Sequence, residues 1–244
     1  MSRRTLLAAA GAVDAPVDPP VDPGPTKLPA DLSMTFDGNS ISAGNNTPEP
    51  LLYYVVEYLN SIGALNSANV HTVAIGGQRW VEMSAAHADV DAAWEPSRTN
   101  VLIAGEDCNS VFQGGKSTAQ VLQDTRDYYA VVKAAHPGWK ILMWGNLPRG
   151  GLSSDAANND SLIALNDYWR NNWQAEGIDG WVDMRTIPQY DHDGTTTEAF
   201  TAYADAWSET APAFVHPLEG TYADNTGARA IARKIAIAMI DLDW

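Results

Sequence analysis

Cysteine and basic residues are scarce in this sequence. Cys108 is the only cysteine among 244 residues, which excludes an intramolecular disulfide and the Cys/His clusters that hold structural zinc. Lys and Arg number 15 against 30 Asp and Glu, giving a net charge of −15. Such a charge repels nucleic-acid phosphates and anionic membrane surfaces, so we expect no nucleic-acid partner. No run approaches the roughly 18 to 20 apolar residues that cross a bilayer, so we expect no membrane insertion.

Residues 1–30 differ in composition from the rest of the chain. The segment from Ser2 to Val13 contains Arg3-Arg4 followed by a short apolar run, and it resembles a twin-arginine export signal. Two Val-Asp-Pro repeats follow, which favour a stiff polyproline-like spacer. Both alternatives, an export signal and a retained Pro-rich arm, place these residues outside the globular fold. With 45% hydrophobic residues, we expect residues 31–244 to form one domain.

From Leu32 onward, short apolar runs alternate with helical patterns, which is typical of a parallel sheet covered by helices. We expect strands at Leu32–Phe36, Val70–Ile75, Val101–Ala104, Lys140–Trp144 and Trp181–Met184. We expect helices near Pro50–Ile62, Thr118–Ala135, Asp160–Ala175 and Thr226–Ile240. Ligands of such open sheets bind at the carboxyl ends of the strands, so the chemistry is expected there.

The first expected strand ends in Phe36-Asp37-Gly38-Asn39-Ser40-Ile41-Ser42-Ala43-Gly44. This segment resembles the first block of the SGNH (GDSL) hydrolases, which reads Gly-Asp-Ser followed by a small or hydroxylated residue two positions later. Asn39 stands where the family has Asp. Taken alone, Gly-Asn-Ser is also an ordinary turn. The resemblance implies that Ser40 is the nucleophile.

Two further segments resemble the blocks that hold the oxyanion in this family. Gly76-Gly77-Gln78 follows the second strand, where the family has a glycine whose backbone N–H binds the oxyanion. Gly105-Glu106-Asp107-Cys108-Asn109 follows the third strand, and two registers are possible there. Placing Asp107 at the donor position would set a carboxylate against the oxyanion, whereas Asn109 can donate. The resemblance therefore implies an oxyanion hole made by Ser40, Gly77 and Asn109.

The last block of the family carries the general base in Asp-x-x-His-Pro. Phe214-Val215-His216-Pro217 precedes the final expected helix, so the resemblance makes His216 the base. The family acid falls at Ala213, and alanine cannot orient an imidazole. Either a backbone carbonyl holds His216 in a Ser-His dyad, or an acid comes from elsewhere, with Asp191, Asp193, Asp205 and Glu209 as candidates.

The remaining histidines and tryptophans have simpler interpretations. His71 lies in a strand pattern, His87 on a polar helical stretch and His136 at a helix stop, so all three are expected to be structural or solvated. His192 is flanked by aspartates, but adjacent side chains of an extended segment point apart, so no metal site is expected. Trp80 and Trp144, near strand ends, are candidates to line the acyl or sugar pocket.

As a whole, the resemblance implies an α/β fold, a three-layer α/β/α sandwich with a parallel, flavodoxin-like sheet. It implies a serine esterase that works through an acyl-enzyme without metal or cofactor. Short-chain acyl esters on carbohydrate, acetyl first, are the expected substrates. The Pro-rich arm suggests attachment to a structural partner in a virion or cell-surface assembly, hence an extracytoplasmic or virion-associated location. The alternative is a non-catalytic structural or glycan-binding decoration protein that retains the SGNH fold, motivated by Asn39, Asp107 and Ala213.

Overall fold

The computed structural model describes residues 28–44, 49–65, 67–146, 156–184, 188–190, 196–199 and 226–244. Of the expected N-terminal arm, residues 1–27 lie outside the described residues. The proposed base His216, the acid position Ala213 and the alternative acids Asp191, Asp193, Asp205 and Glu209 also lie outside the described residues.

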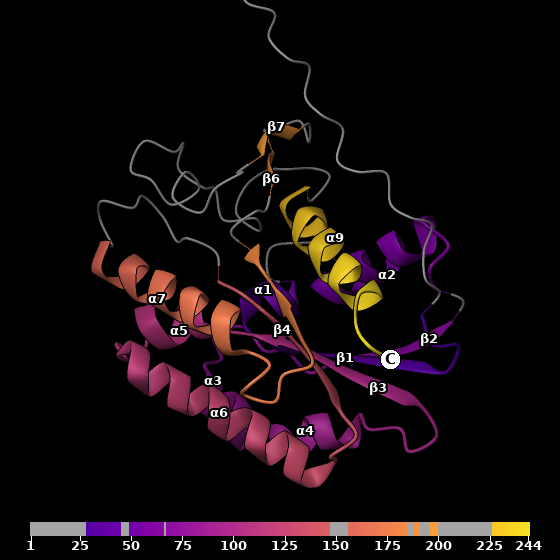
Figure 1. Ribbon diagram of the computed structural model, residues 1–244, viewed down its shortest axis with the longest axis horizontal. Helices are drawn as coiled ribbons and strands as arrows, with labels where there is room; N and C mark the ends of the chain where they lie inside the picture. The colour runs from indigo at the N-terminus through magenta and orange to yellow at the C-terminus, as the bar shows by residue number, and fades with distance from the viewer. Residues whose placement is uncertain are drawn as a thin grey trace, which may run out of the picture.

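A parallel sheet of five strands forms the centre of the structure (Figure 1). The strands are β1 (Leu32–Gly38), β2 (Ala68–Thr72), β3 (Thr99–Gly105), β4 (Lys140–Trp144) and β5 (Gly180–Val182). Their order is β2-β1-β3-β4-β5, with every neighbouring pair parallel. This is the flavodoxin-like order, in which the chain reverses direction across the sheet between β1 and β3.

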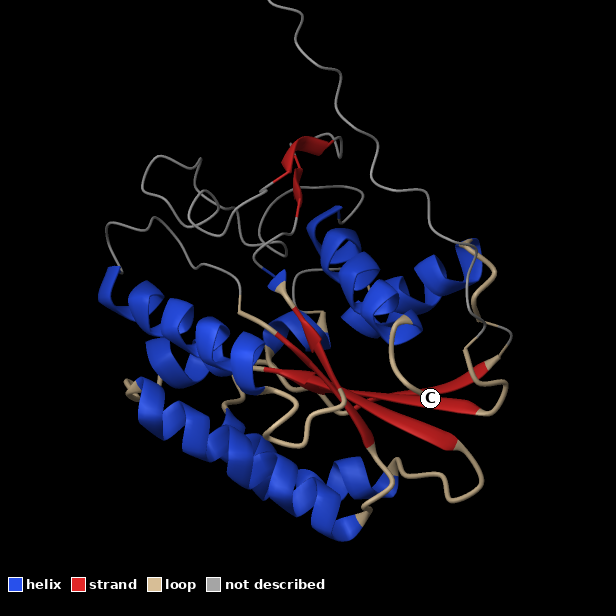
Figure 2. Cartoon of the chain, viewed as in Figure 1, coloured by secondary structure: helices blue, strands red, loops and turns tan. Residues whose placement is uncertain are grey.

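Helices cover both faces of the sheet, which makes three layers (Figure 2). On one face lie α2 (Leu51–Ser61) and α9 (Thr226–Ile240), and the short α1 (Ser40–Ala43) follows β1. The other face carries α3 (Trp80–Ala85), α4 (His87–Ala92), α5 (Asp107–Phe112), α6 (Thr118–Ala135) and α7 (Ala156–Asn172). A small antiparallel pair, β6 (Pro188–Tyr190) and β7 (Thr196–Ala199), is separate from the main sheet.

The architecture expected from the sequence is confirmed, and the bounds of α6, α9 and β4 agree with those expected. Two strand predictions were displaced: β2 covers Ala68–Thr72 instead of Val70–Ile75, and β5 covers Gly180–Val182 instead of Trp181–Met184. The helices α3 and α5 were not predicted, and α4 was expected only as a polar helical stretch at His87. Each has six residues, fewer than two turns, so none shows a readable hydrophobic period.

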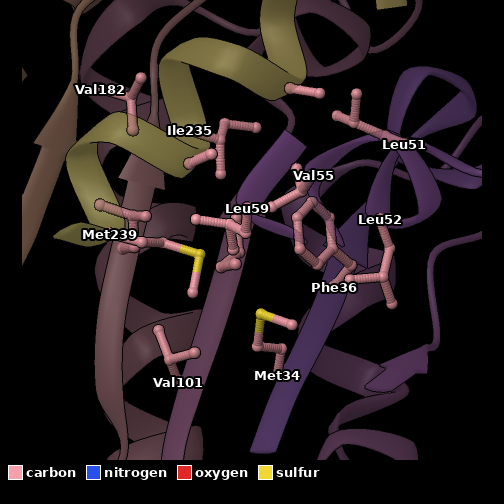
Figure 3. Packing of buried hydrophobic residues seen from close by; sticks show 14 of the residues in the cluster. Met34, Phe36, Leu51, Leu52, Val55, Leu59, Val101, Val182, Ile235 and Met239 are labelled. Carbon is pink, nitrogen blue, oxygen red and sulfur yellow. The ribbon is translucent and has the colours of Figure 1, made fainter. Parts of the chain in front are cut away.

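The apolar layer between the sheet and the α2/α9 pair is the larger part of the core (Figure 3). Met34 and Phe36 point from β1 toward this layer, and Val55 and Leu59 meet them from α2. All residues of β1 are buried because the strand has a neighbour on each side and helices over both faces. The final helix completes the layer with a stripe at helical spacing, formed by Ile231, Ala232, Ile235, Ala236 and Met239.

Among the residues that the structure describes, no helix is both long and apolar enough to cross a membrane.

Two isoleucines of α9 allow a matched test of this packing. Ile235 is fully buried, whereas Ile237 is 39% exposed on the same helix. Ile235→Ala should lower the free energy of unfolding by about 2 to 5 kcal/mol, because it removes buried apolar atoms and leaves a cavity. Ile237→Ala should change it by less than about 1 kcal/mol. Urea titration monitored by tryptophan fluorescence measures both, and equal losses would contradict this placement of α9.

Candidate active site

Ser40 lies at the carboxyl end of β1, where the strand turns into α1. It is the first residue of that helix and is partly exposed. The preceding Asn39 caps the helix, because its side-chain oxygen accepts a hydrogen bond from the backbone N–H of Ile41 at 3.0 Å. Asparagine and aspartate are about equally good at this position. Replacement of the family aspartate by Asn39 therefore preserves the turn that presents Ser40.

The turn requires glycine at position 38. Gly38 has φ +147°, and a Cβ there would lie 2.5 Å from Oγ of Ser42 and 2.8 Å from the carbonyl oxygen of Gly105. Both contacts are far inside van der Waals distance, so a side chain would displace the turn. Gly38 therefore lets β1 and β3 remain in register up to the residue pair Gly38 and Gly105.

The segment after β2 runs beside this turn. The N–H of Val73 donates to the carbonyl of Phe36 at 2.9 Å, and the N–H of Ile75 donates to that of Gly38 at 3.1 Å. These bonds continue the alignment with β1 beyond the end of β2 and bring the segment that leads into Gly77 beside Gly38. Gly77 has φ +86° and is exposed, and no acceptor for its N–H is found among the described residues.

Asn109 reaches the Gly77 loop from α5. Its Nδ2 donates to the backbone carbonyl of Gln78 at 3.1 Å, and its Oδ1 accepts from Nε2 of Gln113 at 2.9 Å. Asn109 is buried, with 4% of its surface exposed. The amide of Asn109 is thus held beside the loop that carries Gly77, at the same edge of the sheet as Ser40.

The Glu106 side chain joins the loop before α3 to the loop before α5. This buried carboxylate accepts from the N–H of Ser110 at 3.1 Å and the hydroxyl of Ser110 at 2.7 Å, which caps α5. It also accepts from the N–H of Trp80 at 3.0 Å, at the start of α3. Backbone donors from two helices thus meet on one side chain, which links the loop before α3 to the loop before α5. The sequence pattern did not predict this role for Glu106.

Asp37 is a second buried carboxylate, directly before the Gly38 turn. Oδ1 accepts from the N–H of Gly38 at 2.7 Å, and Oδ2 accepts from the hydroxyl of Tyr128 at 2.6 Å. Burial raises the pKa of Asp37 to about 6, although both hydrogen bonds act to lower it. Burial also raises the pKa of Tyr128 well above its usual value, so its hydroxyl keeps its proton and donates.

The structure thus brings Ser40, Gly77 and Asn109 to one edge of the sheet, while His216 lies outside the described residues. The hydroxyl of Ser40 has no hydrogen-bond partner among the described residues. No group of three metal-ligating side chains is found in that part of the chain either.

The proposed pocket role of Trp80 and Trp144 was wrong. Trp80 is fully buried in α3, with its ring 5.3 Å from that of Tyr128. Trp144 is also buried, and its ring packs over Gly105. Both tryptophans belong to the core beneath the site, because their large apolar rings fill the space between sheet and helices.

No protein-family model matches the sequence, and no curated protein matches it. Solved structures do match. One is a protein assigned to the GDSL-like lipases from Parabacteroides merdae, with a TM-score of 0.60 and 16% identity, covering 87% of this chain and 97% of that one. An acetyl xylan esterase has a TM-score of 0.58 and 14% identity, covering 83% and 96%. A protein assigned to the lipolytic G-D-S-L family from Desulfitobacterium hafniense has a TM-score of 0.56 and 11% identity, covering 84% and 98%.

The chain therefore has the fold of the GDSL (SGNH) hydrolases. This confirms the fold class expected from the sequence. The segments that resemble the family's motifs follow β1, β2 and β3.

The raised pKa of Asp37 predicts a pH-dependent stability. The folded state keeps the Asp37 proton up to about pH 6, whereas the unfolded state keeps it only up to about pH 3.8. Protonated Asp37 therefore contributes its full stability below about pH 3.8, and this contribution to the free energy of unfolding is lost as the pH rises through 6. Asp37→Asn cannot ionise, and its amide can still accept from Gly38 and donate to the Tyr128 hydroxyl. As the pH rises from about 4 to about 8, the free energy of unfolding of Asp37→Asn relative to that of wild type should increase by up to about 3 kcal/mol.

Urea unfolding of both proteins at the two pH values measures this difference, because the other titrating groups are common to both. A stability difference that does not change with pH would contradict the buried, raised-pKa carboxyl at position 37.

Proposed function

We propose that this chain is a serine esterase that hydrolyses short-chain acyl esters, acetyl first, on carbohydrate. The observation that carries the proposal is the meeting of three loops at one sheet edge. The Ser40 turn is aligned with the loop after β2 through the Ile75 to Gly38 hydrogen bond, and Asn109 bonds that same loop at Gln78. A hydroxyl, an open backbone N–H and a side-chain amide thereby lie together, which are the groups that acyl transfer uses.

In the proposed reaction, Oγ of Ser40 attacks the ester carbonyl carbon while His216 accepts its proton. The negative charge that develops on the carbonyl oxygen is stabilised by the N–H groups of Ser40 and Gly77 and by Nδ2 of Asn109. The tetrahedral intermediate expels the alcohol, which takes the proton from His216 and leaves an acyl-enzyme. A water activated by His216 then releases the carboxylic acid and restores Ser40.

The choice of acetylated carbohydrate has two supports. An acetyl xylan esterase shares the fold over most of both chains. The net charge of −15 disfavours polyanionic substrates such as phosphorylated or sulfated polymers and leaves neutral sugars as better candidates. Acetate release from acetylated xylan, compared with release of longer acyl chains from nitrophenyl esters, tests this part of the proposal.

The nucleophile can be tested with a matched serine and a matched histidine. Ser40→Ala should lower turnover of 4-nitrophenyl acetate by roughly a thousandfold or more, because the proposed acyl-enzyme forms on Oγ of Ser40. His216→Gln should cause a comparable loss. Ser61→Ala, at the exposed end of α2, and His87→Gln, on α4, should leave turnover unchanged. Circular dichroism checks that each variant is folded.

Wild-type turnover retained in a folded Ser40→Ala protein would overturn the proposed mechanism. A wild-type chain with no turnover of any of these esters would favour the non-catalytic decoration protein.

The oxyanion donor separates the two registers of the third block. Asn109→Ala should raise the acylation barrier by about 2.7 to 4 kcal/mol, since one donor to the oxyanion is lost. Asp107→Ala should change kcat little, because a carboxylate at this position would not stabilise an oxyanion. Steady-state kinetics on 4-nitrophenyl acetate measures both variants, and a larger loss for Asp107→Ala would show that the register is wrong.

A further inference from the structure

Gln113 contacts the side chain that the proposed reaction uses to bind the oxyanion. It caps the carboxyl end of α5, four residues after Asn109, and its Nε2 donates to Oδ1 of Asn109 at 2.9 Å. Residues four apart on a helix lie on the same face, so α5 itself brings the two amides together. Gln113 is exposed to solvent, so its side chain can be exchanged without opening the core.

The orientation of the Asn109 amide follows from its two partners. The carbonyl oxygen of Gln78 can only accept, so the Asn109 atom facing it at 3.1 Å must be Nδ2. Oδ1 then faces Gln113, which must present its own NH₂ group. One Nδ2 hydrogen is used on Gln78, and the other remains for a ligand.

Without Gln113, only the single bond to Gln78 would hold this amide. Rotation about the last side-chain torsion of an asparagine is soft and roughly two-fold, so one bond leaves the direction of the second Nδ2 hydrogen poorly defined. A donor to the Oδ1 oxygen restricts that rotation. It also withdraws electron density from the amide, which makes the remaining N–H a better donor.

We propose that Gln113 is a positioning residue for the oxyanion hole, holding Asn109 so that its free Nδ2 hydrogen points at the developing charge. The inference rests on the proposed esterase function and deepens it. Gln113 does not touch the reacting atoms, and its whole effect on the reaction passes through Asn109.

Two substitutions separate positioning from a plain structural role. Gln113→Met keeps the length and helix propensity of the side chain and removes the donor. Gln113→Glu is closer in shape, but at neutral pH it sets a carboxylate against Oδ1 of Asn109, so two acceptors face each other. A structural role makes Glu the milder change, whereas positioning makes it the more damaging one.

Gln123 provides a matched control. On the exposed side of α6, its Nε2 donates to Oδ1 of Asp127 at 2.8 Å, also over four residues. Gln123→Met removes the same type of bond from a position with no contact to the Gly77 loop or to Asn109.

The measurement is kcat and KM for 4-nitrophenyl acetate, with melting temperature for each variant. Gln113→Met should lower kcat about tenfold and Gln113→Glu more, up to the roughly 10²- to 10³-fold loss expected for removing an oxyanion donor. KM should stay within about twofold, because the interaction is made in the transition state. Gln123→Met should match wild type. In an Asn109→Ala background, Gln113→Met should have no further effect on kcat.

Three results would overturn the inference while leaving the esterase intact: unchanged kcat in both Gln113 variants, a Glu variant milder than the Met variant, or an undiminished Gln113→Met effect in the Asn109→Ala background. A wild-type chain without esterase turnover is distinguishable from these, because it would overturn the proposed function and this inference together.

Discussion

The site depends on the pairing of β1 with a parallel neighbour on each side. Because parallel strands end at the same edge of a sheet, this pairing delivers the Gly38 to Ser40 turn between the loop after β2 and the loop after β3. Alignment continues past the last residue of β2 through the Ile75 to Gly38 hydrogen bond, and β3 stays in register as far as Gly105. Gly38 makes this close approach possible, since any side chain there would collide with the carbonyl of Gly105.

Two buried carboxylates, Glu106 and Asp37, then fix the positions of the loops at this edge of the sheet. The Glu106 carboxylate binds the first turns of α3 and α5, so the loops before those helices cannot shift independently. Asp37 accepts hydrogen bonds from Gly38 and Tyr128 and so connects the Gly38 to Ser40 turn to α6. An ionised carboxylate in a core is unfavourable unless donors surround it, and its hydrogen bonds have strict directions. Burying these two carboxylates therefore costs some stability, and their hydrogen bonds fix the geometry at the sheet edge.

Strand and helix alternation was readable in the sequence because the long elements are strongly patterned: the eighteen residues of α6 agree with the expected bounds. Ser40, Gly77 and Asn109 could be proposed because the family-like blocks keep their order and each follows a strand. The network around them could not be predicted. The hydrogen bonds of Glu106 and Gln113 exist only once α5 forms. A helix of six residues is too short to show a hydrophobic period in the sequence. Trp80 was misplaced because a tryptophan near a strand end looks the same in sequence whether it lines a pocket or fills the core.

The arrangement of the nucleophile and the oxyanion donors is the central claim, and a crystal structure of the chain after reaction with a fluorophosphonate ester tests it most directly. The expected result is a covalent bond between phosphorus and Oγ of Ser40, with the phosphoryl oxygen about 2.7 to 3.1 Å from the backbone N of Gly77 and from Nδ2 of Asn109. Labelling of another residue, or a Ser40 adduct whose phosphoryl oxygen points away from Gly77 and Asn109, would contradict it.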